Sequence, residues 1–243
     1  MNSAIIVAAG KGSRMHSTLS KQYLEIGGKA ALYWAMKAFL DHKRIDEIVV
    51  LIGEGELELY ENAVQRHMEP AKPVRVAAGG AERTDSVRKG LELVDQRTEY
   101  VLIHDGARPL VRAEDIDAVL DGLRDYDACI TGVYVKDTIK ILDKSGVIVD
   151  TPIRSRVFAA HTPQGFKREK LTAAYEKLEG EKSGLILTDE SMVMEKTGHE
   201  VKTVIGSYEN IKITTSEDLD LAEKILAKRR RMQEGSYEDW DWV

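Results

Sequence analysis

The chain has very little cysteine and no long apolar run. Cys129 is the only cysteine among 243 residues, so no disulfide can form within the chain. No apolar stretch approaches the roughly 20 residues that span a bilayer, and the first residues lack the basic region and long apolar core of a signal peptide. These absences predict a protein of the reducing cytoplasm that binds no membrane.

Positively charged side chains are also outnumbered by negatively charged ones. The formal net charge is −6, which argues against a general nucleic-acid binder. No Ser-His-Asp order, no zinc-type Cys/His spacing and no carboxylate pair stands out. A hydrophobic fraction of 43% suffices for a substantial core. We expect one domain over residues 1–232 and an acidic, aromatic tail at 233–243, for which disorder and docking both stay open.

Apolar runs alternate with helical patterns along the chain. The expected strands are Ala4–Ala9, Glu47–Ile52, Val74–Ala77, Tyr100–His104, Ala128–Val133 and Glu200–Val204. The expected helices are Ala31–Asp41, Glu56–His67, Arg83–Leu93, Glu114–Leu123, Arg168–Leu178, Glu190–Thr197 and Glu217–Met232. Strand runs that are apolar throughout are typical of strands covered on both faces. The alternation therefore predicts an α/β fold with a mostly parallel sheet, whose ligands bind beyond the carboxyl ends of the strands.

The first expected strand leads into a glycine turn with two cations nearby. Gly10 and Gly12 permit close backbone approach, and backbone N–H groups around such a turn form a nest for anions. Arg14 and Lys21 add positive charge. The pattern differs from the dinucleotide fingerprint, because Met15 holds the place of the third glycine, and from the P-loop, because its Gly-Lys-Ser/Thr ending is missing. We expect a turn that wraps a nucleoside triphosphate.

Two later turns also follow expected strands. The turn at Gly80, with the Ser86 hydroxyl, offers hydrogen-bonding groups to a flat base, although a plain helix start explains the pattern equally well. Asp105 and Arg108 follow a buried strand, and a carboxylate beside a triphosphate suits Mg²⁺ or its water shell. We expect His104 to be a hydrogen-bonded structural group rather than a general base.

Three polar residues toward the end of the chain lie at turns or strand ends. Thr162 belongs to a Thr-Pro-Gln-Gly turn, and Thr188 suits either a ligand contact or a helix cap. Lys212 lies in an apolar run that predicts a strand, and a buried lysine needs a partner, which a bound phosphate would supply. A phosphate monoester is largely ionised at neutral pH, so as a nucleophile it needs alignment and surrounding cations rather than a base.

The segment 135–158 breaks the alternation. Two alternating runs flank Asp143–Gly146, which is a hairpin signal. A two-stranded hairpin alone is marginal in water. We therefore expect an arm that packs against a second subunit, with packing on its own domain as the alternative.

Eight motifs together resemble the 2-C-methyl-D-erythritol 4-phosphate cytidylyltransferase family. They occur in the family's order between about Ile5 and Leu226. The motifs are Ala-Ala-Gly-x-Gly-x-Arg-Met, Lys-Gln-Tyr-Leu, Gly-Gly-x-x-Arg-x-x-Ser-Val, His-Asp-x-Ala-Arg-Pro, Asp-Thr-x-Lys, Thr-Pro-Gln, Thr-Asp-Glu and Asn-Ile-Lys-x-Thr. The ordered set is far more specific than any one of its members.

The resemblance implies a fold and a set of site residues. The fold would be a three-layer, Rossmann-like nucleotidyltransferase with a mostly parallel central sheet and a protruding β-hairpin arm that makes a homodimer. Arg14 and Lys21 would stabilise the pentavalent α-phosphate. The nucleotide would be held by Ala8, Ala9, Gly10, Gly12, Gly80 and Ser86. The sugar-alcohol phosphate would be held by Asp105, Arg108, Thr138, Arg154, Thr162, Thr188 and Lys212, two of them on the neighbour's arm.

The resemblance also implies a reaction. CMP would pass from CTP to 2-C-methyl-D-erythritol 4-phosphate, which gives 4-diphosphocytidyl-2-C-methyl-D-erythritol and pyrophosphate for isoprenoid synthesis. Mg²⁺ would take part, held by the triphosphate alone or also by Asp105. The nearest alternative is D-ribitol-5-phosphate cytidylyltransferase, whose relatives tend to carry valine where this chain has Gly106–Ala107. Ala81 replaces an acidic residue of some relatives, which puts one side-chain contact with the base in doubt.

Two further alternatives belong to other functional classes. A nicotinamide-dependent oxidoreductase is disfavoured by the missing third glycine at Met15. A silent nucleotide-binding module is disfavoured because Arg14 and Lys21 are both present, and binding alone does not require cations at the α-phosphate.

Overall fold

The computed structural model describes residues 1–10, 20–180 and 187–234 and contains a seven-stranded sheet. The strand order is β11-β7-β10-β6-β1-β4-β5. In chain order these strands are β1 (Asn2–Ala8), β4 (Glu47–Ile52), β5 (Val74–Ala78), β6 (Tyr100–Asp105), β7 (Ala128–Tyr134), β10 (Phe158–Lys167) and β11 (Val201–Ile205). Gly12 and Arg14 lie outside the described residues, as does most of the tail.

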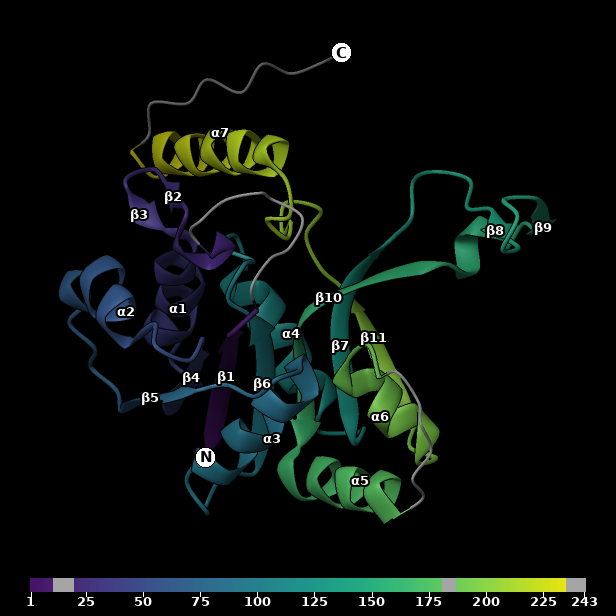
Figure 1. Cartoon of the computed structure of the whole chain (residues 1–243), viewed down its shortest axis with the longest axis horizontal. Helices are drawn as coiled ribbons and strands as arrows, with labels where there is room; N and C mark the ends of the chain where they lie inside the picture. Colours follow the sequence, from purple (N-terminus) through teal and green to yellow (C-terminus); the bar gives the residue numbers. More distant parts are fainter. Residues whose placement is uncertain (11–19, 181–186, 235–243) are drawn as a thin grey trace.

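Seven α-helices accompany the sheet in the described part of the chain (Figure 1). They are α1 (Ala31–Asp41), α2 (Leu57–Ala63), α3 (Arg83–Leu93), α4 (Ala113–Gly122), α5 (Arg168–Gly180), α6 (Glu190–Lys196) and α7 (Ser216–Gln233). Short 3₁₀ turns occur at η1 (Lys21–Tyr23), η2 (Gln65–His67) and η3 (Arg154–Arg156). Two small hairpins pair β2 (Glu25–Ile26) with β3 (Lys29–Ala30) and β8 (Ile141–Leu142) with β9 (Ile148–Asp150).

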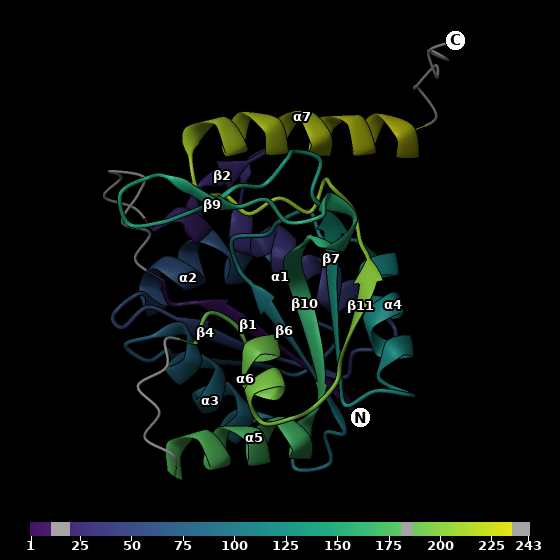
Figure 2. The ribbon, with the colours of Figure 1, turned by 90° about the vertical axis from the view of Figure 1, so that its right-hand side faces the viewer.

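The helices cover both faces of the sheet, which confirms the predicted three-layer arrangement. Successive side chains of a strand point to opposite faces. Accordingly, Ile6 packs in a cluster with residues of α1, α2 and α4, whereas Ile5 packs in a second cluster with residues of α3, α5 and α6. Both side chains are fully buried, so the strand is apolar throughout. Helix α7 lies across one end of the sheet, opposite α5 (Figure 2).

One central strand was missing from the sequence prediction. Residues 158–167 form β10, which lies between β6 and β7 and is antiparallel to both. The segment around Thr162 is therefore not a turn. Pro163 and Gly165 obscure the strand, because both residue types are disfavoured there. The pairing with β7 shifts register between Ala160 and Gln164, and the Thr162–Pro163 bond in that interval is cis.

Two other sequence predictions are wrong in detail. The helix expected at Glu56–His67 stops at Ala63, because Val64 leaves helical geometry with φ −126° and ψ −64° while its side chain is fully buried. Lys212 lies in no strand. Its segment is held instead by a hydrogen bond from the Ile213 N–H to the Ala107 carbonyl (2.8 Å).

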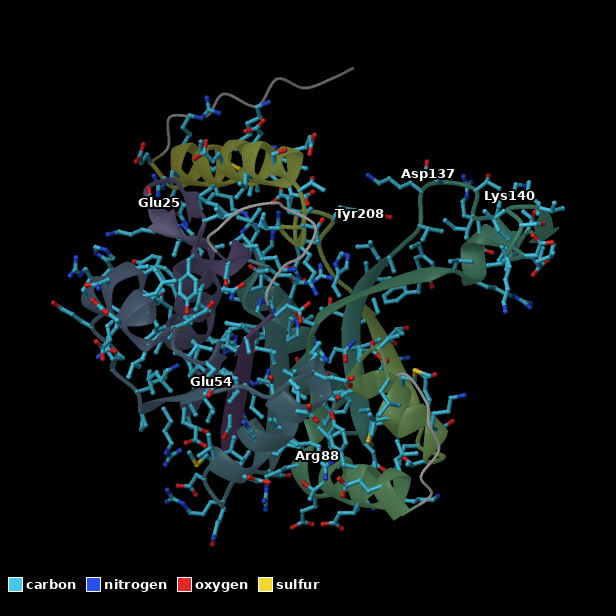
Figure 3. All side chains as sticks on the ribbon, viewed as in Figure 1. Glu25, Glu54, Arg88, Asp137, Lys140 and Tyr208 are labelled. Atoms are coloured by element: carbon cyan, nitrogen blue, oxygen red, sulfur yellow. The ribbon has the colours of Figure 1, made fainter. Side chains whose placement is uncertain are left out.

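The predicted hairpin is present and extends away from the sheet as an arm (Figure 1). Its apolar residues are largely exposed, at 55% for Ile148 and 63% for Ile153, so the alternative that it packs on its own domain is wrong. Figure 3 shows the side chains of Asp137 and Lys140 on this arm, away from the body of the molecule. In the described part of the chain, no helix is both long and apolar enough to cross a membrane.

Candidate active site

A pocket of about 130 Å³ lies beyond the carboxyl ends of β1 and β6. Its lining includes five residues that the family motifs assign to nucleotide binding, namely Ala8, Ala9, Gly10, Gly80 and Ser86. Lys21, Asp105 and Lys212 also line it. The turns that follow three different strands therefore converge at one edge, as expected for a parallel α/β sheet.

The nucleotide side of the pocket is a tightly packed glycine turn. A Cβ atom on Gly80 would lie 2.2 Å from the Cβ of Asp85, and one on Gly79 would lie 2.4 Å from that of Ala9. The Gly80 N–H donates to Ser86 Oγ (2.9 Å), and that hydroxyl donates to the Glu82 carbonyl (3.2 Å). Ser86 thus shapes the turn from inside, and only glycine fits at its two positions.

Asp105 lines the same pocket and is surrounded by cations. Its Oδ1 accepts from Arg83 Nε (3.2 Å), its Oδ2 accepts from Lys212 Nζ (2.7 Å), and Arg108 Nε lies 3.7 Å from Oδ2. Burial alone would raise the pKa of Asp105, but the charges of Arg83, Lys212 and Arg108 outweigh it and hold the pKa well below its ordinary range. The carboxylate therefore stays ionised and gathers three cations, of which Arg83 and Lys212 line the pocket.

His104 is fully buried behind Asp105. Its Nε2 lies 3.0 Å from the Arg108 carbonyl, which can only accept, so Nε2 carries the proton and Nδ1 accepts from the Thr162 hydroxyl (2.9 Å). Thr162 Oγ1 in turn accepts from the Asp105 N–H (3.1 Å). Burial lowers the pKa of His104 to about 4. His104 is thus a neutral structural group, as predicted.

Arg108 and Lys212 differ in their freedom to meet a ligand. Arg108 is buried, and its Nη1 donates to the Asn210 carbonyl (2.7 Å). Asn210 Nδ2 donates in turn to the Thr162 carbonyl (2.8 Å), which ties the segment before Lys212 to β10. Lys212 has a side chain that is 35% exposed. Its expected partner was a phosphate, and in this structure its partner is Asp105.

Comparison with known proteins places this geometry in a family. The family model described as 2-C-methyl-D-erythritol 4-phosphate cytidylyltransferase (IspD) matches residues 2–228. The chain belongs to this family. A protein of that name from Caldanaerobacter subterraneus subsp. tengcongensis is 45% identical over 93% of this chain and 99% of its own length. One from Clostridium botulinum strain 657 is 44% identical over 93% and 98%.

Solved structures agree with this assignment. The 4-diphosphocytidyl-2C-methyl-D-erythritol synthase of Anaerococcus prevotii superposes with a TM-score of 0.81 at 34% identity, covering 93% of this chain and 98% of that one. The 2-C-methyl-D-erythritol 4-phosphate cytidylyltransferase of Thermus thermophilus gives a TM-score of 0.73 at 28% identity, covering 93% and 100%. The resemblance deduced from the ordered motifs is thereby confirmed.

Five of the residues implied by the family motifs do not line the pocket, namely the buried Arg108 and Thr162 and the exposed Thr138, Arg154 and Thr188. Thr138 and Arg154 are exposed on the arm, where Arg154 Nη1 donates to the Lys136 carbonyl (3.2 Å). Thr188 is exposed just before α6, but it is not the cap. Asp189 caps that helix by accepting from the Met192 N–H (3.0 Å).

Sequence reasoning gave no site role to Arg83 and Gln22, which line the pocket, or to Glu190, which pairs with Arg83. Arg83 lines the pocket, and its Nη1 donates to the fully buried Glu190 (2.5 Å). Gln22 Nε2 donates to the Ala8 carbonyl (2.5 Å), which fixes η1 against the end of β1. All three residues belong to the family motifs. However, charged residues at the start of a helix usually lie on its solvent-exposed face. The sequence therefore did not indicate that Arg83 and Glu190 form a buried ion pair.

The described residues offer little to a metal ion. They contain no group of three or more His, Cys, Asp or Glu side chains that could ligate one. Asp105, the single carboxylate proposed for this role, is already paired with cations on both oxygens. This donor set does not fit a metal cage made by the protein.

Proposed function

We propose that the protein transfers CMP from CTP to 2-C-methyl-D-erythritol 4-phosphate, releasing pyrophosphate and supplying an isoprenoid precursor pathway. The observation that carries this proposal is a single pocket with two kinds of lining. Glycine turns at Gly10 and Gly80 line part of it, and Asp105 with its cations Arg83 and Lys212 lines another part. The glycine turns suit a nucleotide and the cations suit a phosphate monoester.

The chemistry follows from the charge of the two substrates. The phosphate monoester is largely dianionic at neutral pH, with a second pKa near 6. One of its oxygens attacks the α-phosphorus of CTP, the bond from that phosphorus to the bridging oxygen breaks, and pyrophosphate leaves with the electron pair. No base is required. Lys21, together with Arg14, supplies positive charge to the pentavalent α-phosphate.

The acceptor phosphate would meet Lys212 and Arg108. Lys212 is the more exposed of these two cations, and Asp105 orients both. Two anionic substrates repel each other in water, so a pocket that gathers cations from several elements lowers the free energy of bringing them together. The cations thus offset the negative charge that builds up while CMP is transferred.

Magnesium would enter the reaction with the triphosphate rather than from a site on the protein. The fit of the described residues supports this, since Asp105 already pairs with Arg83 and Lys212. Bound to the triphosphate, Mg²⁺ neutralises phosphate charge. The residues of this chain hold and orient the two substrates, and their roles do not depend on ligating the ion.

The arm would join two copies of the chain into a homodimer. It exposes a run of apolar residues, among them Leu142, Val147, Ile148, Val149 and Ile153. An exposed apolar patch of this kind marks an interaction surface, and a second copy would also bring Thr138 and Arg154 to the neighbour's pocket. The cytoplasmic location stays a prediction from the sequence.

A pyrophosphate-release assay tests the proposed reaction. CTP and UTP are each combined with 2-C-methyl-D-erythritol 4-phosphate and with D-ribitol 5-phosphate. We expect release with CTP and the methylerythritol phosphate, and little with the other three pairs. Release only with the ribitol phosphate would assign the sister reaction, and no release with any pair would contradict the proposal.

A further inference from the structure

A buried ion-pair chain extends from the pocket into the body of the protein. Arg83, at the start of α3, uses two nitrogens for two carboxylates. Its Nε donates to Asp105 Oδ1 (3.2 Å) and its Nη1 donates to Glu190 Oε2 (2.5 Å). The hydroxyl of Tyr175, on α5, donates to the other oxygen of Glu190 (3.2 Å). The guanidinium group therefore joins α3 to β6 and α6, and Glu190 adds α5 through Tyr175.

Because this series of ion pairs is buried, each charged group in it needs its partner. Glu190 is fully buried, and its described partners are Arg83 and Tyr175. A buried carboxylate is costly unless it is paired and hydrogen-bonded. Burial would lower the pKa of Arg83, but Glu190 and Asp105 outweigh it and raise the pKa. The guanidinium is thus charged and held from both sides.

The backbone around Glu190 is held by hydrogen bonds that do not involve Arg83. Gln164, a buried residue of β10, donates from Nε2 to Asp189 Oδ2 (2.7 Å) and accepts at Oε1 from the Ser191 N–H (3.3 Å). The residues before and after Glu190 are therefore both bound to the centre of the sheet. This leaves the Glu190 side chain little freedom to follow Arg83 if the arginine moves.

We infer that Glu190 is a positioning residue for the acceptor phosphate, because it holds Arg83 against Asp105. With Oδ1 taken by Arg83, the Asp105 carboxylate presents Oδ2 to Lys212. The terminal torsion of an aspartate is soft, so without Arg83 the carboxylate could rotate and Lys212 would lose its fixed position. Arg83 is then a brace whose Nε and Nη1 are bound to carboxylates, and Lys212 and Arg108 meet the substrate. This inference rests on the proposed function.

Steady-state kinetics of three variants test the inference. Glu190→Gln removes the charge that holds Arg83, and Arg83→Lys keeps a charge but cannot reach both carboxylates with one nitrogen. We expect each to raise the KM for methylerythritol phosphate about tenfold, as for one lost charge-assisted hydrogen bond. The KM for CTP stays within about twofold. The double variant is no worse than the more impaired single variant, because both changes break the same brace.

A matched control removes a carboxylate that pairs with another arginine of α3. Glu179 on α5 pairs with Arg88 on α3 at the surface, with side chains 56% and 36% exposed. Glu179→Gln should leave both KM values unchanged. Tyr175→Phe, which removes only the hydroxyl that binds Glu190, gives a milder version of the same selective change if Glu190→Gln folds poorly.

Two kinetic outcomes would overturn the inference. Equal rises in KM for both substrates in Glu190→Gln would show a general structural role. A much larger effect of Arg83→Lys, additive with Glu190→Gln, would make Arg83 itself a phosphate ligand.

An NMR signal separates this inference from the proposed function. The Nε–H resonance of Arg83, assigned by its loss in Arg83→Lys, is recorded in the protein without substrates. We expect Glu190→Gln and Tyr175→Phe to shift it and Glu179→Gln to leave it in place. An unshifted resonance in Glu190→Gln would overturn the brace. Failure of the wild-type protein to turn over methylerythritol phosphate would instead count against the proposed function.

Discussion

Asp105 shows how one side chain organises the site. Its two oxygens pair with Arg83 and Lys212, and its backbone N–H donates to Thr162. The sequence identified Asp105 from its place at a strand end, and this could be predicted because strand ends gather at one edge. The pairing of Asp105 with Arg83 and of Arg83 with Glu190 could not be predicted, since pairs separated by 22 and 107 residues leave no local pattern.

Replacing Lys21 by alanine tests its proposed role at the α-phosphate. Lys21 lines the pocket on the 3₁₀ turn η1. Its charge is needed when negative charge builds up on the α-phosphate, so we expect kcat to fall about 10²–10³-fold. Circular dichroism and the melting temperature should change little. Lys29→Ala, outside the pocket, is the control, and unchanged turnover in Lys21→Ala would rule out this role.

One buried and one partly buried histidine predict how stability depends on pH. The pKa of His104 and that of His161 are each lowered by burial to about 4 in the folded chain, from an ordinary 6.5. Between these values the unfolded chain binds more protons, so the free energy of unfolding falls as the pH drops from about 6.5 to about 4. Urea denaturation at several pH values across this range measures the free energy of unfolding. His161→Gln should reduce the slope, and an identical slope would contradict the assignment.

At the scale of single elements, β10 was the hardest to predict. Its sequence contains Pro163 and Gly165, which argue against a central strand. The structure accommodates them because the register shifts around Pro163, and because a Cβ on Gly165 would lie 2.4 Å from Val119 Cγ1 on α4. Contacts with residues far away in the sequence make Pro163 and Gly165 acceptable in this strand. The sequence of the strand itself does not reveal those contacts.

Gly165→Ala tests that packing. The added methyl group meets the fully buried side chain of Val119. We expect the free energy of unfolding to fall by about 1–3 kcal/mol, the usual cost of overpacking a core. Urea titration of both proteins measures the difference. A loss below about 0.5 kcal/mol is typical of an ordinary surface site. It would show that α4 shifts to accommodate the methyl group and would contradict the tight packing.

The arm predicts a selective effect on one substrate. Arg154→Ala should raise the KM for methylerythritol phosphate about tenfold, because a charge-assisted contact from the neighbour's arm is lost. The KM for CTP should be nearly unaltered. Arg156→Ala, on the same 3₁₀ turn, is the matched control. Equal losses for both substrates in Arg154→Ala would contradict the role of the arm.

At the scale of the whole molecule, the three-layer architecture followed from the sequence. Strands that are apolar on both faces, such as β4, leave no arrangement other than burial between two layers of helices. The predicted hairpin was also found, since Asp143 and Gly146 make a tight turn in which Asp143 accepts from the Ser145 and Val147 N–H groups. Where the arm ends up depends on a second chain, and no local pattern specifies that.

The assembly is tested by changing the apolar surface of the arm. Ile148 is 55% exposed, and Ile148→Lys would place a charge in a subunit interface. We expect wild-type protein to show the mass of two chains in light scattering coupled to size exclusion, and the variant to show one. A wild-type mass of one chain at micromolar concentration would contradict the homodimer.

A crystal structure of the protein with bound CTP tests the central claim most directly. The account predicts cytosine against the Gly79–Gly80 turn and Lys21 Nζ about 3 Å from an α-phosphate oxygen. It also predicts that Lys212 and Asp105 remain paired on the far side of that phosphate. A triphosphate bound elsewhere, with Lys21 turned away from it, would contradict the account.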